Sequence, residues 1–141
     1  MALVSKAAAE WRGDLGGAGT IDLVSSGRAD LAYNWKARSE GVDGVTTPEE
    51  VLGAAHAGCF AMALSNELAG LGHVPVSVRA AAAVTFDPAA GGIQSSHLVV
   101  KADVPGLDPA EFQRVAASAK VNCPVSKALA GIPITLDASL A

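Results

Sequence analysis

Hydrophobic and polar residues alternate over short stretches near the N-terminus, a spacing that is typical of β-strands. Residues 8–12 and 20–24 flank the glycine-rich stretch 16–19, so they are predicted to form a hairpin. A third strand is expected over residues 32–37. The N-terminal part of the chain is therefore predicted to be a group of strands.

A long apolar segment follows, and it begins with the signals of a helix N-terminus. Thr47 is placed to cap the helix, Pro48 fits its first position, and glutamates at 49 and 50 favour the positive end of the helix dipole. Apolar residues then recur at separations of three and four, which predicts one inward face, and the glycines of residues 70–72 are expected to end the helix. The predicted inward residues are Val51, Leu52, Ala55, Cys59, Met62 and Ala63.

The C-terminal half returns to strand-like spacing. Residues 74–86 and 93–102 are joined by a turn at 87–92 and predict a second hairpin, and a last strand is expected over 132–139. Between them, Asp108 marks the capped start of another helix. Strand hairpins on both sides of a long apolar helix, without regular βαβ alternation, indicate an α+β fold. The predicted inward residues of the second helix are Phe112, Val115, Ala116 and Ala119.

Composition restricts the classes of protein that fit. With 141 residues, half of them hydrophobic, the chain is long enough for one domain with its own core, predicted to span residues 1–141. A net charge of −4 and the lack of a basic patch argue against nucleic-acid binding. Apolar stretches are interrupted before they reach membrane-spanning length, and residues 1–6 lack the layout of a signal peptide. We therefore expect a cytoplasmic protein with no membrane or nucleic-acid partner.

The chain has two cysteines, and their local contexts differ. Cys123 precedes Pro124, which disfavours a helical conformation at Cys123 and fits the first position of a short helix. Cys123 is then the N-cap, where unpaired N–H groups favour a thiolate. Cys59 lies in mid-helix, where the helix dipole contributes little, so its thiolate needs a nearby cation. The alternative for each is a small buried hydrophobic residue without chemistry.

Residues 48–64, together with the downstream motif Cys-Pro-Val-Ser at 123–126, closely resemble the OsmC/Ohr family of thiol peroxidases. The likeness covers almost the whole chain, and two cysteine motifs in the same order and spacing make it specific. His56 before the first cysteine is similar to the OsmC branch, the osmotically inducible proteins, rather than to the organic hydroperoxide resistance branch. The absence of arginine from 16–19 and the position of Arg38 agree with that branch.

The resemblance implies a peroxidase of oxidative or osmotic stress defence that reduces organic hydroperoxides, with inorganic peroxide as a further substrate. Cys59 would attack the O–O bond and become a sulfenic acid, which Cys123 would condense into a disulfide. This redox-active disulfide would be transient, because the cytoplasm is reducing. No bound cofactor is implied. An external dithiol reductant, of the lipoyl type in this family, would restore both thiols.

Two charged residues complete the site that the resemblance implies. Arg38 would stabilise the Cys59 thiolate and donate hydrogen bonds to the peroxide oxygen as negative charge develops there. Glu49 corresponds to the family's active-site glutamate and would orient Arg38 through paired hydrogen bonds, with Glu50 as the alternative. Both glutamates also fit a purely structural role, since acids favour the first helical turn whatever the function.

The spacing of Glu49 and Cys59 has a consequence for assembly. Ten positions along one helix correspond to about 15 Å along its axis, too far for both residues to border one pocket unaided. Two such helices packed antiparallel across a two-fold axis would bring the glutamate of one chain near the cysteine of the other. We therefore expect an intertwined homodimer. The resemblance implies an OsmC-like fold for each chain, with two strand groups around a central helix that carries the reactive cysteine.

Other interpretations of these residues stay open. The same thiols fit a redox sensor that switches partner binding on oxidation, and inert thiols would fit a non-catalytic binding domain for small molecules. His56 is expected to make hydrogen bonds near Cys59, because scattered histidines and only two cysteines do not predict a zinc site. Large apolar residues are expected in the core, with an apolar mouth for organic hydroperoxides as the alternative for some. These residues are Trp11, Trp35, Phe60, Met62 and Phe86.

Overall fold

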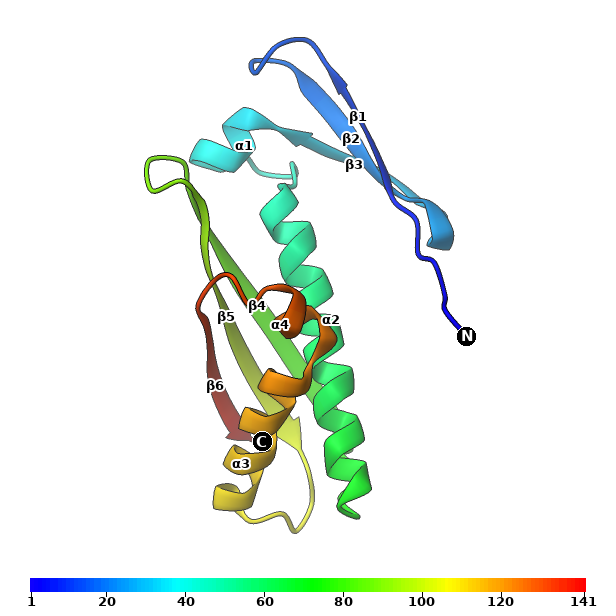
Figure 1. The fold of residues 1–141 in the computed structure, drawn as a ribbon, viewed down its shortest axis with the longest axis vertical. Helices are drawn as coiled ribbons and strands as arrows, with labels where there is room; N and C mark the ends of the chain where they lie inside the picture. Colours follow the sequence, from blue (N-terminus) through cyan, green and yellow to red (C-terminus); the bar gives the residue numbers. More distant parts are fainter. The chain divides into compact units, whose positions relative to one another are not determined.

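The computed structural model describes residues 1–141, which divide into two compact units, residues 1–51 and 52–141. Helix α2, Pro48–Gly70, begins in the first unit and continues in the second (Figure 1). Each unit contains a three-stranded sheet of its own. The combination of two small sheets with separate helices confirms the predicted α+β class. The prediction of a single domain over the whole chain stays a prediction.

The first unit is built on an antiparallel sheet in the order β1-β2-β3. The predicted hairpin is confirmed as β1, Ala8–Arg12, and β2, Ala18–Leu23, and a short 3₁₀ turn at Val24–Ser26 leads to β3, Arg28–Asn34. Gly19 of β2 is required by its neighbours, because a Cβ there would lie 2.1 Å from the Glu10 carbonyl oxygen. A larger residue would therefore push the strands apart.

The third predicted strand was placed too late in the chain. Residues 35–37 belong instead to helix α1, Trp35–Glu40. The cause is Asn34, whose side-chain oxygen accepts a hydrogen bond from the Ala37 N–H at 2.7 Å and so caps the helix. Alternating hydrophobicity continued past the cap, and the short helix was therefore predicted as strand.

Helix α2 begins and ends where the sequence predicts. The Thr47 hydroxyl accepts from the Glu50 N–H at 3.0 Å, Pro48 is the first helical residue, and the helix ends at Gly70. Its predicted inward face is wrong in part, since Ala55 and Met62 are exposed. The helix is apolar almost all round, so the spacing of apolar residues did not select one face. The α2 side chains that are buried within the second unit are instead those of His56, Phe60, Leu64 and Leu68.

The second unit has a sheet in the order β4-β5-β6. The predicted second hairpin is confirmed as β4, Ser77–Asp87, antiparallel to β5, Gly92–Asp103. The last strand, β6, Ile134–Leu140, runs parallel to β5 on the opposite edge. Parallel neighbours need a crossover, which α3, Pro109–Asn122, and α4, Pro124–Ala128, supply.

The core of the second unit lies between β5 and the helices. Asp108 caps α3 by accepting from the Glu111 N–H at 3.0 Å, which confirms the predicted helix start. All four predicted inward residues of α3 are buried. One buried cluster joins α2, β5 and α3, and the second cysteine belongs to it. Its members from these elements include Phe60, Leu64, Leu68, Leu98, Val100, Ala102, Phe112, Ala116, Ala119 and Cys123.

Candidate active site

Cys123 lies at the break between α3 and α4. Pro124 begins α4, and Cys123 has φ −54° and ψ 123°, outside the helical region, as a residue before proline prefers. Its own N–H is used, donating to the Ala119 carbonyl at 2.8 Å. The backbone N–H groups of Ser126 and Val125 at the start of α4 lower the pKa of its thiol. The predicted N-cap position is therefore confirmed, and the side chain is fully buried.

Cys59 meets Cys123 from α2. Both thiols are free, and they are close enough for each to shift the pKa of the other. Cys59 is partly exposed, whereas Cys123 is buried, so solvent and small solutes reach the pair at Cys59. The structure thus brings together the two thiols that the sequence singled out.

The two thiols are shifted in opposite directions. Burial raises the pKa of Cys59, and the neighbouring Cys123 raises it further, against the lowering effect of the Val125 N–H. Burial also raises the pKa of Cys123, but hydrogen bonds from the Ser126 N–H, the Cys59 thiol and the Ser126 side chain outweigh it, and the net pKa is lowered. Within the pair, negative charge is therefore favoured on Cys123 rather than on Cys59.

Arg38 and Glu49 form a close ion pair in the first unit. Arg38 Nη2 lies 2.6 Å from Glu49 Oε1, and Arg38 Nε donates to both carboxylate oxygens, at 2.9 and 3.2 Å. The carboxylate is 6% exposed and the guanidinium side chain 30%. Glu50 points elsewhere, accepting from the Thr46 hydroxyl at 2.5 Å. Of the two glutamates considered, Glu49 is therefore the partner of Arg38.

An aromatic cavity lies beside Arg38. Trp11 and Tyr33 flank Gly19 on adjacent strands, and their ring centroids are 5.3 Å apart across it. The Arg38 guanidinium carbon lies 6.0 Å from the centre of the Trp35 ring. The cavity has a volume of about 190 Å³. Its lining residues are Trp11, Leu15, Tyr33, Asn34, Trp35, Arg38 and Pro48.

This cavity corrects the expectation that both tryptophans are core residues, because Trp11 and Trp35 line a space open to solutes. Phe60 is fully buried, as expected, whereas Met62 is 75% exposed and is not a core residue. Trp11 and Tyr33 are brought together by the pairing of their strands with Gly19, and no sequence pattern shows that pairing.

His56 is buried at the centre of the second unit. Its Nδ1 lies 2.7 Å from the Ser96 hydroxyl and its Nε2 lies 2.9 Å from the Ser126 hydroxyl. Burial lowers its pKa, so the ring is neutral at neutral pH. The expected hydrogen-bonding role of His56 is confirmed, although sequence reasoning identified neither serine as its partner. No group of three His, Cys, Asp or Glu side chains is arranged to hold a metal ion.

The four predicted site residues therefore form two local pairs. Arg38 and Glu49 pair within residues 1–51, and Cys59 and Cys123 pair within residues 52–141. A partly exposed thiol beside a buried thiol of lowered pKa is typical of proteins with dithiol redox chemistry. The class of protein follows from this pair and from the α+β scaffold that holds it.

Comparison with known proteins narrows that class. Residues 41–137 match the family model described as OsmC-like protein. The chain is 39% identical over 143 residues to "Peroxiredoxin OsmC" of Escherichia coli (strain K12), and the match covers 99% of each chain. The protein of the same name from Shigella flexneri matches equally well. This chain belongs to the OsmC family.

Solved structures agree with this assignment. The organic hydroperoxide resistance protein OhrB of Bacillus subtilis superposes with a TM-score of 0.66 at 26% identity, covering 95% of this chain and 98% of that one. A protein described as an organic hydroperoxide resistance protein OsmC from Legionella pneumophila gives 0.69 at 21% identity, with 99% of each chain covered. At that identity the second comparison supports the fold alone.

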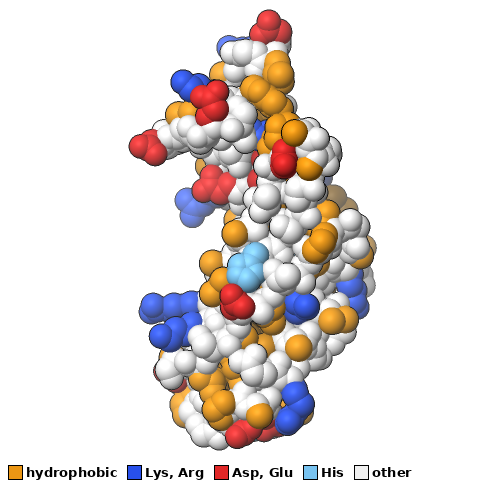
Figure 2. Space-filling model, turned by 90° about the vertical axis from the view of Figure 1, so that its left-hand side faces the viewer, with side chains coloured by type: hydrophobic (Ala, Val, Ile, Leu, Met, Phe, Trp, Pro, Cys, Tyr) orange, Lys and Arg blue, Asp and Glu red, His pale blue; other side chains and the backbone are white.

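The surface adds two negative findings. None of the helices is long and apolar enough to span a bilayer. Figure 2 shows Lys and Arg side chains interspersed with Asp and Glu on the face it views, without a field of one sign. That face therefore lacks the basic surface that nucleic-acid binding requires.

Proposed function

We propose that this chain reduces organic hydroperoxides with Cys59 as the attacking thiol and Cys123 as the resolving thiol. Membership of the OsmC family and 39% identity to a peroxiredoxin make it a thiol peroxidase of stress defence. The observation that carries the assignment of roles is the pair of neighbouring thiols, of which only Cys59 is accessible. A peroxide from solution reaches Cys59 first.

The proposed chemistry uses both sulfurs in order. The Cys59 thiolate attacks the outer peroxide oxygen, the O–O bond breaks, and the organic part leaves as an alcohol after taking a proton. Cys59 is then a sulfenic acid. The Cys123 thiolate attacks this sulfur, an S–S bond forms, and the hydroxide that leaves takes a proton from solvent to become water. The lowered pKa of Cys123 suits the second step.

The first step needs negative charge on Cys59, whose pKa is raised by its surroundings in the second unit. A permanent cation beside the sulfur would move the charge from Cys123 to Cys59. We assign that role to Arg38, held in orientation by its hydrogen bonds to Glu49. The guanidinium would also donate to the leaving oxygen as charge develops there.

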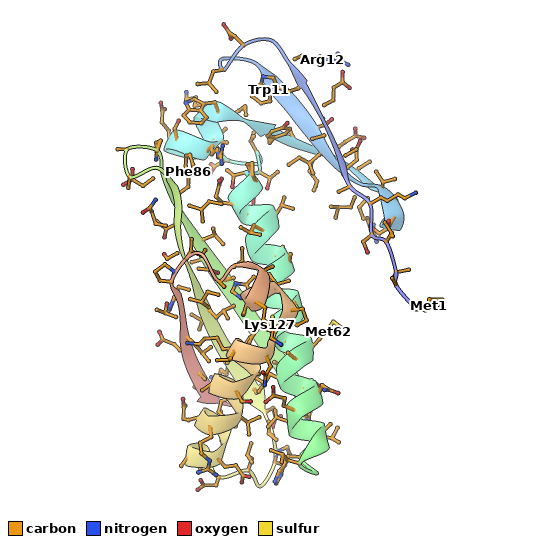
Figure 3. The ribbon with its side chains drawn as sticks, viewed as in Figure 1. Met1, Trp11, Arg12, Met62, Phe86 and Lys127 are labelled. Carbon is orange, nitrogen blue, oxygen red and sulfur yellow. The ribbon has the colours of Figure 1, made fainter.

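We further propose that Arg38 and Cys59 meet across a homodimer. Helix α2 has a stripe of small or apolar residues at alternating separations of three and four, the spacing of a helix-packing seam. Met62 of this stripe is 75% exposed and points away from the sheet β4–β6 (Figure 3). A Cβ at Gly58 would contact nothing within 4 Å, which leaves room for a second helix. The stripe consists of Ala55, Gly58, Met62, Ser65 and Ala69.

The aromatic cavity supports organic hydroperoxides as the substrate class. Its walls are the rings of Trp11, Tyr33 and Trp35, and its one charged residue is Arg38. Aromatic walls favour an apolar organic group, while the guanidinium favours the polar peroxide end. We place the organic part of the substrate in this cavity. Inorganic peroxide would gain nothing from these walls and is the poorer substrate in this proposal.

Two further parts of the proposal concern the cellular setting. A small dithiol, of the lipoyl type, is the proposed reductant, because a second thiol on the same molecule resolves the mixed disulfide rapidly. The cytoplasm is the proposed location, since the cycle needs a reducing pool that reopens the disulfide.

Stopped-flow oxidation by cumene hydroperoxide tests the proposal, with mass spectrometry of the products. We expect rapid loss of both thiols in the unmodified chain and catalytic turnover with excess dithiol. Cys123→Ser should stop at a sulfenic acid, and its matched partner Cys59→Ser should not react. Reaction no faster than that of free cysteine would overturn the peroxidase assignment, and a single oxidation without turnover would contradict the catalytic cycle.

A further inference from the structure

A buried chain of hydrogen bonds connects three elements of the second unit. Ser96 of β5 contacts His56 Nδ1 at 2.7 Å, and His56 Nε2 contacts Ser126 of α4 at 2.9 Å. Ser96 and His56 are fully buried, and Ser126 is 6% exposed. Polar groups are costly to bury, and in this chain of bonds every one of them has a partner. The chain of bonds reaches the resolving thiol through Ser126, because the Ser126 side chain is one of the groups that lower the pKa of Cys123.

The position of Ser126 in α4 explains its contact with sulfur. Cys123 is the N-cap of α4, and Ser126 follows three residues later, in the first turn. In a helix start the N-cap residue and the residue three positions later are close, and in a capping box the side chain of each reaches the backbone N–H of the other. The Ser126 backbone N–H lowers the pKa of the same thiol. Two groups of Ser126 thus act on Cys123, and the effect of the hydroxyl depends on where its proton points.

Neutral imidazole has one donor nitrogen and one acceptor nitrogen, which allows two proton arrangements here. In the first, Ser96 donates to Nδ1, Nε2–H donates to the Ser126 oxygen, and the Ser126 proton is available to Cys123. In the second, Ser126 gives its proton to Nε2 and has none for the sulfur. Only the first arrangement stabilises a thiolate at Cys123.

The charged groups on the surrounding elements are engaged elsewhere. Glu67 of α2 accepts from Asn122 Nδ2 at 3.1 Å, and Lys120 of α3 donates to the Ile134 carbonyl at 3.3 Å. Lys127 of α4 is exposed. The donors around the Cys123 sulfur are therefore neutral ones, namely backbone N–H groups, a hydroxyl and the Cys59 thiol.

We propose that His56 is a positioning residue for the resolving thiol: donation from its Nε2 to Ser126 directs the Ser126 hydroxyl to Cys123 and favours the thiolate that attacks oxidised Cys59. This inference rests on the proposed role of Cys123 in resolution. It also has a consequence for the first step, since a donor that holds charge on Cys123 leaves the proton on Cys59. The chain of bonds thus assists the second step at the expense of the first.

Titration of Cys123 tests this inference without peroxide. In a Cys59→Ser background, Cys123 is the only thiol, and the ultraviolet absorbance of its thiolate is followed against pH. Ser126→Ala should lower the thiolate fraction at a given pH below the midpoint by roughly tenfold, since a hydrogen bond to a charged acceptor is lost. Ser96→Ala should lower it less, because His56 then keeps its Nε2 partner but loses the donor that fixes its tautomer. Ser118→Ala is the control, because Ser118 is exposed and bonds only to Asn122.

A direct test of the imidazole uses His56→Leu in the same background. Without its partner, the Ser126 hydroxyl is free to donate to the carbonyl one turn back, so the thiolate fraction should fall severalfold. Circular dichroism checks the fold of this variant. If it does not fold, Ser126→Ala and Ser96→Ala, which each remove a single oxygen, still test whether the chain of bonds favours the Cys123 thiolate. An unchanged Cys123 titration in Ser126→Ala would overturn the inference.

Peroxide kinetics then separate this inference from the proposed function. With Cys59 intact, Ser126→Ala should prolong the life of the sulfenic acid without slowing its formation, a split that loss of structure alone would not produce. Slowing of both steps together would contradict the positioning role. Absence of sulfenic acid in the unmodified chain would defeat the proposed function, and the titration of Cys123 would still judge the roles of His56 and Ser126.

Discussion

The two units handle charge in different ways. In residues 1–51 a permanent cation, Arg38, is held by a buried carboxylate, Glu49, through several short contacts. In residues 52–141 two thiols lie together, and neutral neighbouring groups lower the pKa of Cys123 while the pKa of Cys59 is raised. The comparison teaches that the charge of the thiol pair is movable and the charge of the ion pair is fixed. A fixed cation brought to Cys59 would therefore switch the reactive sulfur.

The strongest test of that difference removes the fixed charge. Arg38→Met should slow oxidation of Cys59 by about 100-fold or more, because thiolate stabilisation and donation to the leaving oxygen are both lost. The rate of sulfenic acid formation in Cys123→Ser is the measurement. Arg12→Met is the matched control, since Arg12 pairs with Glu10 on the exposed surface. Equal rates in the Arg38 variant and the control would remove Arg38 from the reaction.

The second test asks whether the two pairs meet across subunits. Met62→Glu places a charge in the proposed seam of α2 and should weaken the dimer by at least about 100-fold, since an unpaired carboxylate is costly to bury. Sedimentation measures the association, and peroxidase activity should fall in parallel and recover at high protein concentration. Val121→Glu is the control, because Val121 is also exposed, at 64%, but lies on α3. A fully active monomer would end the shared-site proposal.

A smaller effect is expected from the residue that orients the cation. Glu49→Gln should slow Cys59 oxidation by about tenfold, because the amide loses the charge that holds the guanidinium in place. Glu50→Gln, one residue along the same helical turn, should have little effect, since Glu50 is exposed and bonds to Thr46. Stopped-flow rates of the two variants give the comparison. Similar losses in both would indicate a general effect of charge at the helix start.

The sequence predicted local features well where a single residue dictates the backbone. Thr47 and Pro48 set the start of α2, and Pro124 set Cys123 at the N-cap of α4. The pairing of Arg38 with Glu49 came from the family resemblance, and the structure selects Glu49 over Glu50. These features depend on a few neighbouring atoms or on a sequence motif, so they can be predicted without knowledge of the packing.

What the sequence did not predict depends on packing between distant segments. The inward face of α2 was misjudged because apolar residues surround the helix, and burial of the polar His56 is decided by Ser96 and Ser126, 40 and 70 residues away. The parallel pairing of β6 with β5 likewise requires a crossover connection, which no local sequence pattern predicts. β3 ends at Asn34 because this residue caps the next helix. The alternation of hydrophobic and polar residues continues past the cap, so it did not predict this end.

The smallest expected effect concerns stability, and it sharpens the contrast between the two sulfurs. In Cys59→Ser the remaining thiol, Cys123, keeps the neighbouring N–H groups and the Ser126 side chain that lower its pKa, so we expect that pKa to stay lowered in the folded state. The folded state then binds fewer protons than the unfolded state between the lowered and the ordinary thiol pKa, so the free energy of unfolding should rise with pH across that interval. This stability is present above the ordinary value and is lost as pH falls through the lowered one.

Cys123→Ser should show the opposite slope. Burial, the main cause, still raises the pKa of Cys59, so the folded state binds more protons than the unfolded state between the ordinary and the raised value. The free energy of unfolding should therefore fall as pH rises through that interval. Each slope is at most about 1.4 kcal/mol per pH unit, the limit for one proton, and urea unfolding at a series of pH values measures both. Slopes of the same sign would mean that the N-cap position of Cys123 does not lower its pKa, and the assignment of the resolving thiolate would then lose its physical basis.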